Sequence, residues 1–353
     1  MTKFRKPLLT ICMGLPLGLM LLGPATHAAA QTDLIVGTAT IEMKDESRSR
    51  VLTSEIWFPA ASGTKAEEFA VLPPLAAIAM TPKAMPAASG ELAKARPLIV
   101  ISHGNWSTRY GHGQLAIELV QAGYIVLTTS HPGTMNGDLR TEYRLRLWER
   151  SKDVSFALSE ILKNTTWSTR IDAQKIGFAG HSFGAWTGVS LAGGRYDFNR
   201  QLEACKGMPE KDQYCTGMMK DYTSELPTKD STDAFLDSRF RAYYLMAGGP
   251  GAGFTPDSLK AIRVPMLFDT AKFDTVLAPA LGSTLMASLI PDAKEIVREV
   301  SHFTYAPMCR PILGRAVLGQ ICVDPDGVDR KQVHAQIGKD AVSFFRASLN
   351  NLN

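Results

Sequence analysis

Short apolar runs alternate with longer amphipathic stretches through the middle of the chain. Short runs bounded by turn residues are typical of buried strands, and the amphipathic stretches between them are typical of helices. The elements expected on this basis are strand 98–102, helix 113–122, strand 125–129, helix 139–163, strand 175–179 and helix 183–192. Strands that alternate with helices predict an α/β fold in which helices cover both faces of a mostly parallel sheet.

The pattern differs at the two ends of this block. Residues 34–43 and 51–58 are strand-like and flank a polar turn, which predicts an N-terminal antiparallel hairpin. The elements expected after the block are strands 243–246, 266–268 and 295–300 and a closing helix over 331–349. We therefore predict that residues 31–353 form a single α/β domain.

Two stretches interrupt the alternation. Residues 69–85 are rich in proline, alanine and methionine, and we interpret them as an excursion rather than a second domain. The chain at about 195–240 turns polar and irregular, which favours an inserted cap or loop region. Both could contribute walls to a pocket, and a simple packing role on the surface is an equal alternative.

The first thirty residues have the features of a secretory signal peptide. A basic start is followed by an apolar run over residues 8–22 and by small residues that end at 28–30. The apolar run is shorter than the ~20 residues that span a bilayer, which favours cleavage over a membrane anchor. We expect a mature chain that begins near Gln31, has no integral membrane segment and is periplasmic or secreted.

Composition excludes several classes of protein. The 353 residues are 45% hydrophobic and 20% charged, which is typical of a folded globular chain and not of a disordered one. The net charge is +4, and three of the 38 basic residues lie in the first thirty, which hold no acid. The remainder carries 35 basic and 34 acidic side chains, or about +1, which gives no electrostatic basis for binding nucleic acid.

Four cysteines remain after the expected cleavage, and they form two close pairs in the sequence. In an oxidising compartment this spacing favours disulfides between Cys205 and Cys215 and between Cys309 and Cys322, with two other pairings open. A zinc site is the alternative, but the C-x-x-C spacing that such sites use is absent from the sequence. No metal is therefore expected.

A G-x-S-x-G motif lies between an expected strand and an expected helix, and its residues are Gly180, His181, Ser182, Phe183 and Gly184. A serine nucleophile must stand clear of its own backbone, and a sharp turn between small residues exposes its hydroxyl. An ordinary turn serine is the alternative, but the flanking strand and helix favour the nucleophile. We expect the Ser182 hydroxyl to be catalytic.

A serine nucleophile needs a base, and His302 has the position expected for one. It follows the last expected strand and precedes the closing helix, which places it above the sheet in the order Ser, Asp, His. A surface-loop histidine is the alternative. His334 is expected to be packed or solvated in the closing helix, whereas His112 and His131 lie in loops at the same rim and could line a pocket.

Two aspartates compete for the third position. Asp269 ends the strand expected at 266–268, whereas Asp274 lies in the loop beyond it, where its side chain can fold back toward an imidazole. We favour Asp274, which would hold the tautomer of His302 and stabilise its imidazolium form. Asp269 remains the alternative. The aspartate that is not the triad acid is expected to be a loop or capping carboxylate.

Backbone donors for an oxyanion are expected at two turns. Ser102, His103, Gly104 and Asn105 follow the first parallel strand, and a turn there directs N–H groups into the crevice. The N–H groups of Asn105 and Phe183 are the expected pair, because oxyanion donors of this kind follow the nucleophile and an early strand. His103 is expected to support the turn rather than to react.

The glycine-rich stretch 248–253 resembles a dinucleotide-binding loop only in part. It follows a strand, but no register satisfies G-x-G-x-x-G, and Pro250 and Pro256 are unfavourable for a following helix. We interpret it as a flexible loop at the rim of the sheet. The sequence also lacks H-E-x-x-H and P-loop motifs, so no cofactor is expected.

Four short motifs carry a resemblance to a known family: 97–104 (PLIVISHG), 130–133 (SHPG), 180–184 (GHSFG) and 301–303 (SHF). With them, the chain from about Leu34 onward resembles an α/β-hydrolase, and more narrowly the bacterial predicted dienelactone hydrolases related to platelet-activating-factor acetylhydrolases. The resemblance implies an exported serine esterase whose triad is Ser182, Asp274 and His302.

The sequence departs from these relatives in two respects. True dienelactone hydrolases use a cysteine nucleophile, and Ser182 stands at that position here. Mammalian platelet-activating-factor acetylhydrolases take their acid from the end of an earlier strand, which here reads Met-Ala-Gly-Gly at 246–249. Asp274 is therefore assigned by its spacing and not by that relative.

The sequence thus predicts an exported serine hydrolase that cleaves small-molecule or lipid-like carboxylic esters through an acyl-enzyme. An amidase or peptidase with the same triad is one alternative, because the motifs do not separate esters from amides. A non-catalytic binding protein on this fold is the other, because fold alone does not imply function. The sequence leaves the oligomeric state open.

Overall fold

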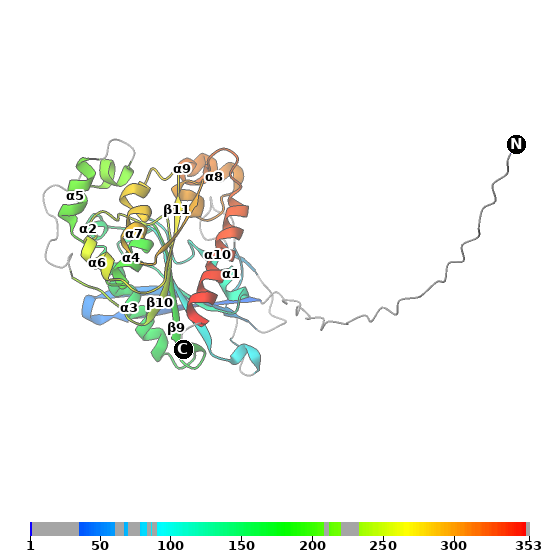
Figure 1. Ribbon diagram of the computed structural model, residues 1–353. Coiled ribbons are helices and arrows are strands. Elements are labelled where there is room, and N and C mark those ends of the chain that lie inside the picture. The colour runs from blue at the N-terminus through cyan, green and yellow to red at the C-terminus, as the bar shows by residue number, and fades with distance from the viewer. Residues whose placement is uncertain are drawn as a thin grey trace. The chain divides into compact units, whose positions relative to one another are not determined.

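In the part of the chain that the structure describes, a ten-stranded sheet organises the fold (Figure 1). The computed structural model describes Met1 and residues 35–60, 67–69, 78–82, 86, 90–207, 212–219 and 233–350. The predicted signal peptide, apart from Met1, and its cleavage site lie outside these residues. Within them no helix is long and apolar enough to span a membrane.

The centre of the sheet is parallel, as predicted. Its strand order is β12-β11-β10-β9-β5-β6-β2-β1-β4-β3, and all pairs from β12 to β6 are parallel. These six strands are β5 (Arg96–Ser102), β6 (Ile125–Thr129), β9 (Ile171–His181), β10 (Phe240–Met246), β11 (Met266–Ala271) and β12 (Lys294–Arg298). The carboxyl ends of all six strands therefore meet at one edge, where ligand sites of open α/β sheets form.

An antiparallel hairpin extends the sheet, as the N-terminal pattern predicts. Strands β1 (Val36–Asp45) and β2 (Arg50–Pro59) are joined by the 3-10 turn η1 (Glu46–Arg48), and β2 pairs antiparallel with β6. The described parts of the stretch expected to be an excursion form edge strands instead, because β4 (Ile78–Pro82) pairs with β1 and β3 (Glu67–Phe69) pairs with β4. The rest of that stretch lies outside the described residues.

Alternating side chains of the buried strands create a separate core on each face of the sheet. On β5, Leu98 and Val100 contribute to one core, while Ile99 and Ile101 contribute to the other, and all four are at most 2% exposed. Apolar runs without polar interruption are what strands buried on both faces require. Burial of each such side chain contributes roughly 1.5–3 kcal/mol.

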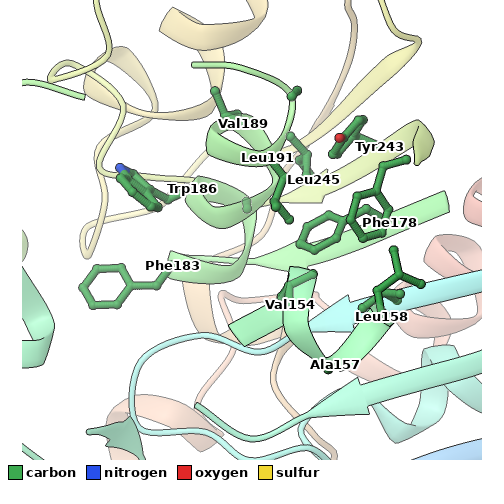
Figure 2. Packing of buried hydrophobic residues seen from close by; sticks show 14 of the residues in the cluster. Val154, Ala157, Leu158, Phe178, Phe183, Trp186, Val189, Leu191, Tyr243 and Leu245 are labelled. Carbon is green, nitrogen blue, oxygen red and sulfur yellow. The ribbon is translucent and has the colours of Figure 1, made fainter. Parts of the chain in front are cut away.

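Helices cover both cores. The first core packs under α3 (Trp148–Lys163), α4 (Phe183–Leu191), α6 (Pro256–Ala261) and α7 (Ser283–Leu289), and the second under α1 (Gly113–Gln121) and α10 (Arg330–Asn350). Figure 1 shows α1 and α10 side by side. Figure 2 shows the first core, where α3, α4, β9 and β10 contribute Val154, Ala157, Leu158, Phe178, Trp186, Val189, Tyr243 and Leu245.

The single helix expected at 139–163 is wrong in its first part. A small hairpin of β7 (Thr134–Met135) and β8 (Asp138–Leu139) is followed by the short helix α2 (Thr141–Leu145), and α3 begins only at Trp148. Leu145 and Leu147 are both buried, yet residues two apart in one helix face nearly opposite sides. The break between α2 and α3 allows both to enter the core.

Two disulfides staple peripheral segments with the pairing that the sequence favours. Cys205–Cys215 (2.05 Å) joins α5 (Phe198–Lys206) to the single π-helical turn η3 (Tyr214–Met218) in the expected cap region. Cys309–Cys322 (1.95 Å) encloses α8 (Pro311–Val317) and α9 (Gly319–Cys322). The remaining short elements are the 3-10 turns η2 (Glu91–Ala93), η4 (Pro279–Leu281) and η5 (His302–Tyr305).

The glycine-rich stretch 248–253 is a loop, as expected, but it is buried rather than a flexible rim. The Gly248 N–H donates a hydrogen bond to Ser283 Oγ (2.6 Å), and the Gly253 N–H donates to Gln201 Oε1 (3.0 Å). A Cβ atom on Gly248 would lie 2.8 Å from the Ala185 side chain in α4. Close packing against α4 therefore accounts for glycine at position 248.

Candidate active site

Ser182 sits on a sharp turn between β9 and α4. Its backbone has φ 58° and ψ −121°, a conformation that costs a non-glycine residue of order 1–3 kcal/mol. Gly180 and Gly184 are required because the turn is so tight. A Cβ atom on Gly180 would lie 2.3 Å from the Gly184 carbonyl oxygen, and one on Gly184 would lie 1.9 Å from the Ser102 carbonyl oxygen.

His302 bridges Ser182 and Asp274. Its Nε2 lies 3.1 Å from Ser182 Oγ, and its Nδ1 lies 2.7 Å from Asp274 Oδ2. Because a carboxylate only accepts, Nδ1 carries the proton and Nε2 of the neutral ring is left to accept one from the hydroxyl. All three residues are buried, with exposed fractions of 5% for Ser182, 3% for His302 and 7% for Asp274.

Local hydrogen bonds fix the two partners of Ser182. His302 begins η5, where Ser301 and Thr304 form a capping box that orients the turn. Asp274 Oδ1 accepts the backbone N–H groups of Val276 (2.9 Å) and Leu277 (2.8 Å), so its other oxygen faces the imidazole.

Asp269 has a different environment. It lies inside β11, which continues to Ala271, and is fully buried. Tyr244 and Tyr305 donate hydroxyl hydrogen bonds to its carboxylate at 2.5 and 2.7 Å, and Arg298 pairs with it through Nε (2.7 Å) and Nη2 (2.9 Å). The structure therefore places Asp274, and not Asp269, against His302.

One expected oxyanion donor, Phe183, follows Ser182 in the chain, and the other, Asn105, follows Gly104, where a Cβ atom would lie 3.1 Å from Ser182 Cβ. Phe183 is the first residue of α4, and the first N–H groups of a helix have no intrahelical partner. Asn105 lies in the loop after β5, and its N–H makes no backbone hydrogen bond in the described part of the chain. Both Asn105 and Ser182 line one pocket.

His103 supports the loop that carries Asn105, which is the role expected for it. The His131 N–H donates to His103 Nε2 (3.2 Å), so the proton of the neutral ring is on Nδ1, which donates to the Gly104 carbonyl (2.6 Å). That carbonyl belongs to the same peptide group as the Asn105 N–H. Burial, together with the nearby Arg150 charge, holds the pKa of His103 well below its ordinary value, so the ring stays neutral.

The pocket beside Ser182 has a largely apolar wall. The loop after β5 and the segment that begins at His302 supply Trp106, Phe303, Ala306, Pro307, Leu318 and Ile321. Leu318 and Ile321 belong to the part of the chain closed by the Cys309–Cys322 disulfide. Sequence reasoning missed this wall, although the cysteine pair brackets two of its residues, Leu318 and Ile321.

The other histidines differ in their relation to the pocket. His112 and His181 line it, and burial lowers the pKa of His112 to about 3 and that of His181 well below its ordinary value. His131 does not line the pocket but is buried behind it, against Ser102 Oγ (2.9 Å) and Asp153 Oδ2 (3.1 Å). Sequence reasoning did not single out His181, whose ring centroid is 4.8 Å from that of His302.

His334 in the closing helix was expected to be either packed or solvated, and the structure shows it packed. His334 Nε2 donates to the Thr304 carbonyl oxygen (2.8 Å) at the back of η5. Among the described residues, no group of three or more His, Cys, Asp or Glu side chains is arranged to hold a metal ion.

The strand order, the antiparallel β1–β2 extension and the serine turn after β9 define the α/β-hydrolase fold. No protein-family model and no curated protein sequence matches the chain. Among solved structures, a ferulic acid esterase from Streptomyces cinnamoneus matches with a TM-score of 0.58 and 18% sequence identity over 92% of each chain. The likeness supports the fold, while the narrower resemblance to dienelactone hydrolases stays a prediction.

Proposed function

We propose that this protein is an exported serine hydrolase that cleaves carboxylic esters, with Ser182, His302 and Asp274 as its triad. The observation that carries the proposal is the continuous hydrogen-bonded line from Ser182 Oγ through both nitrogens of His302 to Asp274. A hydroxyl, an imidazole and a carboxylate in this order are the arrangement that activates a serine for acyl transfer.

The acylation step follows from this geometry. Ser182 Oγ attacks the carbonyl carbon of the ester while its proton passes to His302 Nε2, and the carbonyl π electrons move onto oxygen. Asp274 keeps the Nδ1 proton in place and stabilises the imidazolium without taking the proton. The tetrahedral intermediate collapses, His302 gives its proton to the departing alcohol, and an acyl-Ser182 ester remains.

Deacylation repeats the same steps with water. His302 removes a proton from water, the oxygen attacks the acyl carbon, and Ser182 leaves with the proton returned from His302. In both halves the backbone N–H groups of Asn105 and Phe183 would bind the negatively charged oxygen. One such donor is typically worth about 10²–10³ in turnover.

The pocket supports an ester with an apolar body as substrate. Trp106, Phe303 and Leu318 face the space next to Ser182, and such a wall favours hydrocarbon or aromatic groups over charged ones. The structural neighbour with the same fold is named a ferulic acid esterase, which supports an ester rather than another acyl compound as the substrate class.

Export is supported by the cysteine chemistry. Both disulfides join residues close in the sequence, and bonds of this kind persist in oxidising compartments. With the signal peptide predicted at residues 1–30, they favour a periplasmic or secreted enzyme.

The test is hydrolysis of nitrophenyl esters from acetyl to palmitoyl by the mature protein, beside matched nitroanilides. Ser182→Ala should abolish turnover, whereas Ser190→Ala, a buried serine near the other end of α4, should keep it. Anilide turnover equal to or above ester turnover would favour an amidase. No hydrolysis of either series would favour a binding protein.

A further inference from the structure

Arg150 is a buried arginine that lies behind the active site. It belongs to the first turn of α3 and is 1% exposed. In the part of the chain that the structure describes, it forms no ion pair with a carboxylate within 4 Å. A buried charge without a paired carboxylate is uncommon, because desolvation of the guanidinium is costly.

The guanidinium donates instead to uncharged oxygen atoms on three different elements. At the end of β5, Nη2 donates to Ser102 Oγ (3.2 Å) and to the His103 carbonyl oxygen. On β7, Nη1 donates to Thr134 Oγ1 (2.6 Å), and on α4, Nε donates to Thr187 Oγ1 (3.3 Å).

Two of the acceptors, Thr134 and Thr187, also hydrogen-bond to the segments that carry the expected oxyanion donors. The Thr134 carbonyl oxygen accepts the N–H of Trp106 (2.9 Å), the residue after Asn105. Thr187 Oγ1 donates to the carbonyl oxygen of Phe183 (2.8 Å), the residue whose N–H is the second donor. Arg150 therefore connects the loop of one donor to the helix of the other.

We propose that Arg150 is a positioning residue that sets the spacing of the Asn105 and Phe183 N–H groups and so shapes the oxyanion hole. The inference rests on the proposed function, because it concerns the transition state of that same site. It assigns Arg150 a role in turnover rather than in substrate affinity.

The charge distribution around Arg150 favours this role over a purely stabilising one. The nearby Asp153 carboxylate is already bound to Arg50 (2.7 Å), Arg48 (2.9 Å) and His131 (3.1 Å). Burial lowers the pKa of Arg150 to about 9, so the cation is retained at neutral pH at a cost in desolvation. An apolar side chain would fill this volume without that cost, whereas only a planar, multiply donating group can hold all three elements.

The experiment compares Arg150→Gln and Arg150→Lys with Arg239→Gln in the mature protein. Arg239 is the matched control, because it also binds α3, through Ser159 Oγ (2.9 Å) and the Ser155 carbonyl (2.9 Å). Among the described residues, its side-chain hydrogen bonds go to α3 and Asp237 and not to the oxyanion loops. For each variant, kcat and KM are measured on the best nitrophenyl ester. Affinity for a trifluoromethyl ketone, whose serine adduct carries the oxyanion, is measured in parallel.

Arg150→Gln should lower kcat about 100-fold with KM nearly unchanged, and affinity for the ketone should fall by a similar factor. Arg150→Lys should recover about tenfold of the lost kcat, because it keeps the charge but not the planar fork. Arg239→Gln should leave kcat within about twofold of the wild-type value. A rise in KM with unchanged kcat in Arg150→Gln would overturn the inference. Equal kcat values for Arg150→Gln and Arg239→Gln would overturn it as well.

A second set of variants protects the test if Arg150→Gln does not fold. Thr187→Val and Thr134→Val remove one acceptor each, keep the side-chain volume and leave the arginine in place. Both should lower kcat and ketone affinity together, and unchanged values for both would contradict the role. If the wild-type protein shows no hydrolysis that depends on Ser182, the proposed function is overturned, and the role of Arg150 with it.

Discussion

Gly184 packs directly against Ser102, because a Cβ atom on Gly184 would lie only 1.9 Å from the Ser102 carbonyl oxygen. The contact joins the start of the helix behind the nucleophile to the strand end that leads into the oxyanion loop. Backbone atoms crowd this position, so no side-chain rotation can make room for a methyl group.

Gly184→Ala should therefore displace either α4 or the end of β5. We expect a loss of about 2 kcal/mol or more in the free energy of unfolding, and a large loss of esterase turnover in whatever folds. Gly217→Ala is the control, since a Cβ atom there would meet nothing within 4 Å. Urea denaturation and turnover of the two variants measure the difference, and equal behaviour would contradict the packing account.

The two aspartates near the end of β11 should have opposite effects when changed to asparagine. Asp274→Asn removes the charge that faces His302 Nδ1 and should lower kcat about 10⁴-fold with little change in stability. Asp269→Asn breaks the buried pair with Arg298 and should lower the free energy of unfolding by roughly 3–5 kcal/mol. Folded Asp269→Asn protein should keep most of its kcat. Reversal of the two phenotypes would show that Asp269 is the triad acid.

The Cys205–Cys215 disulfide should influence the triad from a distance. The segment it anchors binds the Asp274 loop, because the Gln213 and Tyr214 N–H groups donate to the carbonyls of Thr275 (2.9 Å) and Val276 (3.1 Å). We expect the double variant Cys205→Ser, Cys215→Ser to lose about 3 kcal/mol of stability and to have a lower kcat.

The second disulfide provides the comparison for that prediction. Cys309 and Cys322 close the segment that carries the pocket residues Leu318 and Ile321, so the corresponding double variant should raise KM more than it lowers kcat. Thermal melts and steady-state kinetics of both double variants separate the two effects. The same kinetic change in both would contradict the assignment.

Acid should destabilise the protein through its buried neutral histidines. Burial lowers the pKa of His112 from 6.5 to about 3, so the unfolded chain binds a proton there that the folded chain does not bind. The free energy of unfolding should therefore fall as the pH decreases from about 6.5, by up to about 1.4 kcal/mol per pH unit for this residue. His112→Gln should flatten the dependence between those two pKa values. Parallel curves for both proteins would contradict it.

Much of the fold follows from local patterns. The strand expected at 125–129 is β6 with the same limits, and the helix expected at 183–192 is α4 to within one residue. The strand was predictable because a strand buried on both faces is rich in apolar residues, and the helix because the serine motif lies between a strand and a helix. The break between α2 and α3 was not predictable, because it depends on how Leu145 and Leu147 pack in the tertiary structure.

The candidate site divides in the same way. Ser182, His302 and Asp274 could be chosen from strand and loop positions, because parallel strands bring their carboxyl ends to one edge. The environment of Asp269 could not be predicted from the sequence, because its partners Tyr244, Arg298 and Tyr305 come from other parts of the chain. Arg150 was also invisible in the sequence, where it reads as one polar position of a helix.

Covalent capture shows whether Ser182 is an activated nucleophile. The mature protein is treated with a fluorophosphonate, digested and analysed by mass spectrometry, with the Asp274→Asn variant alongside. We expect one phosphonyl group per chain on the peptide that contains Ser182, formed much more slowly in the variant. No adduct, or an adduct on another residue, would contradict it.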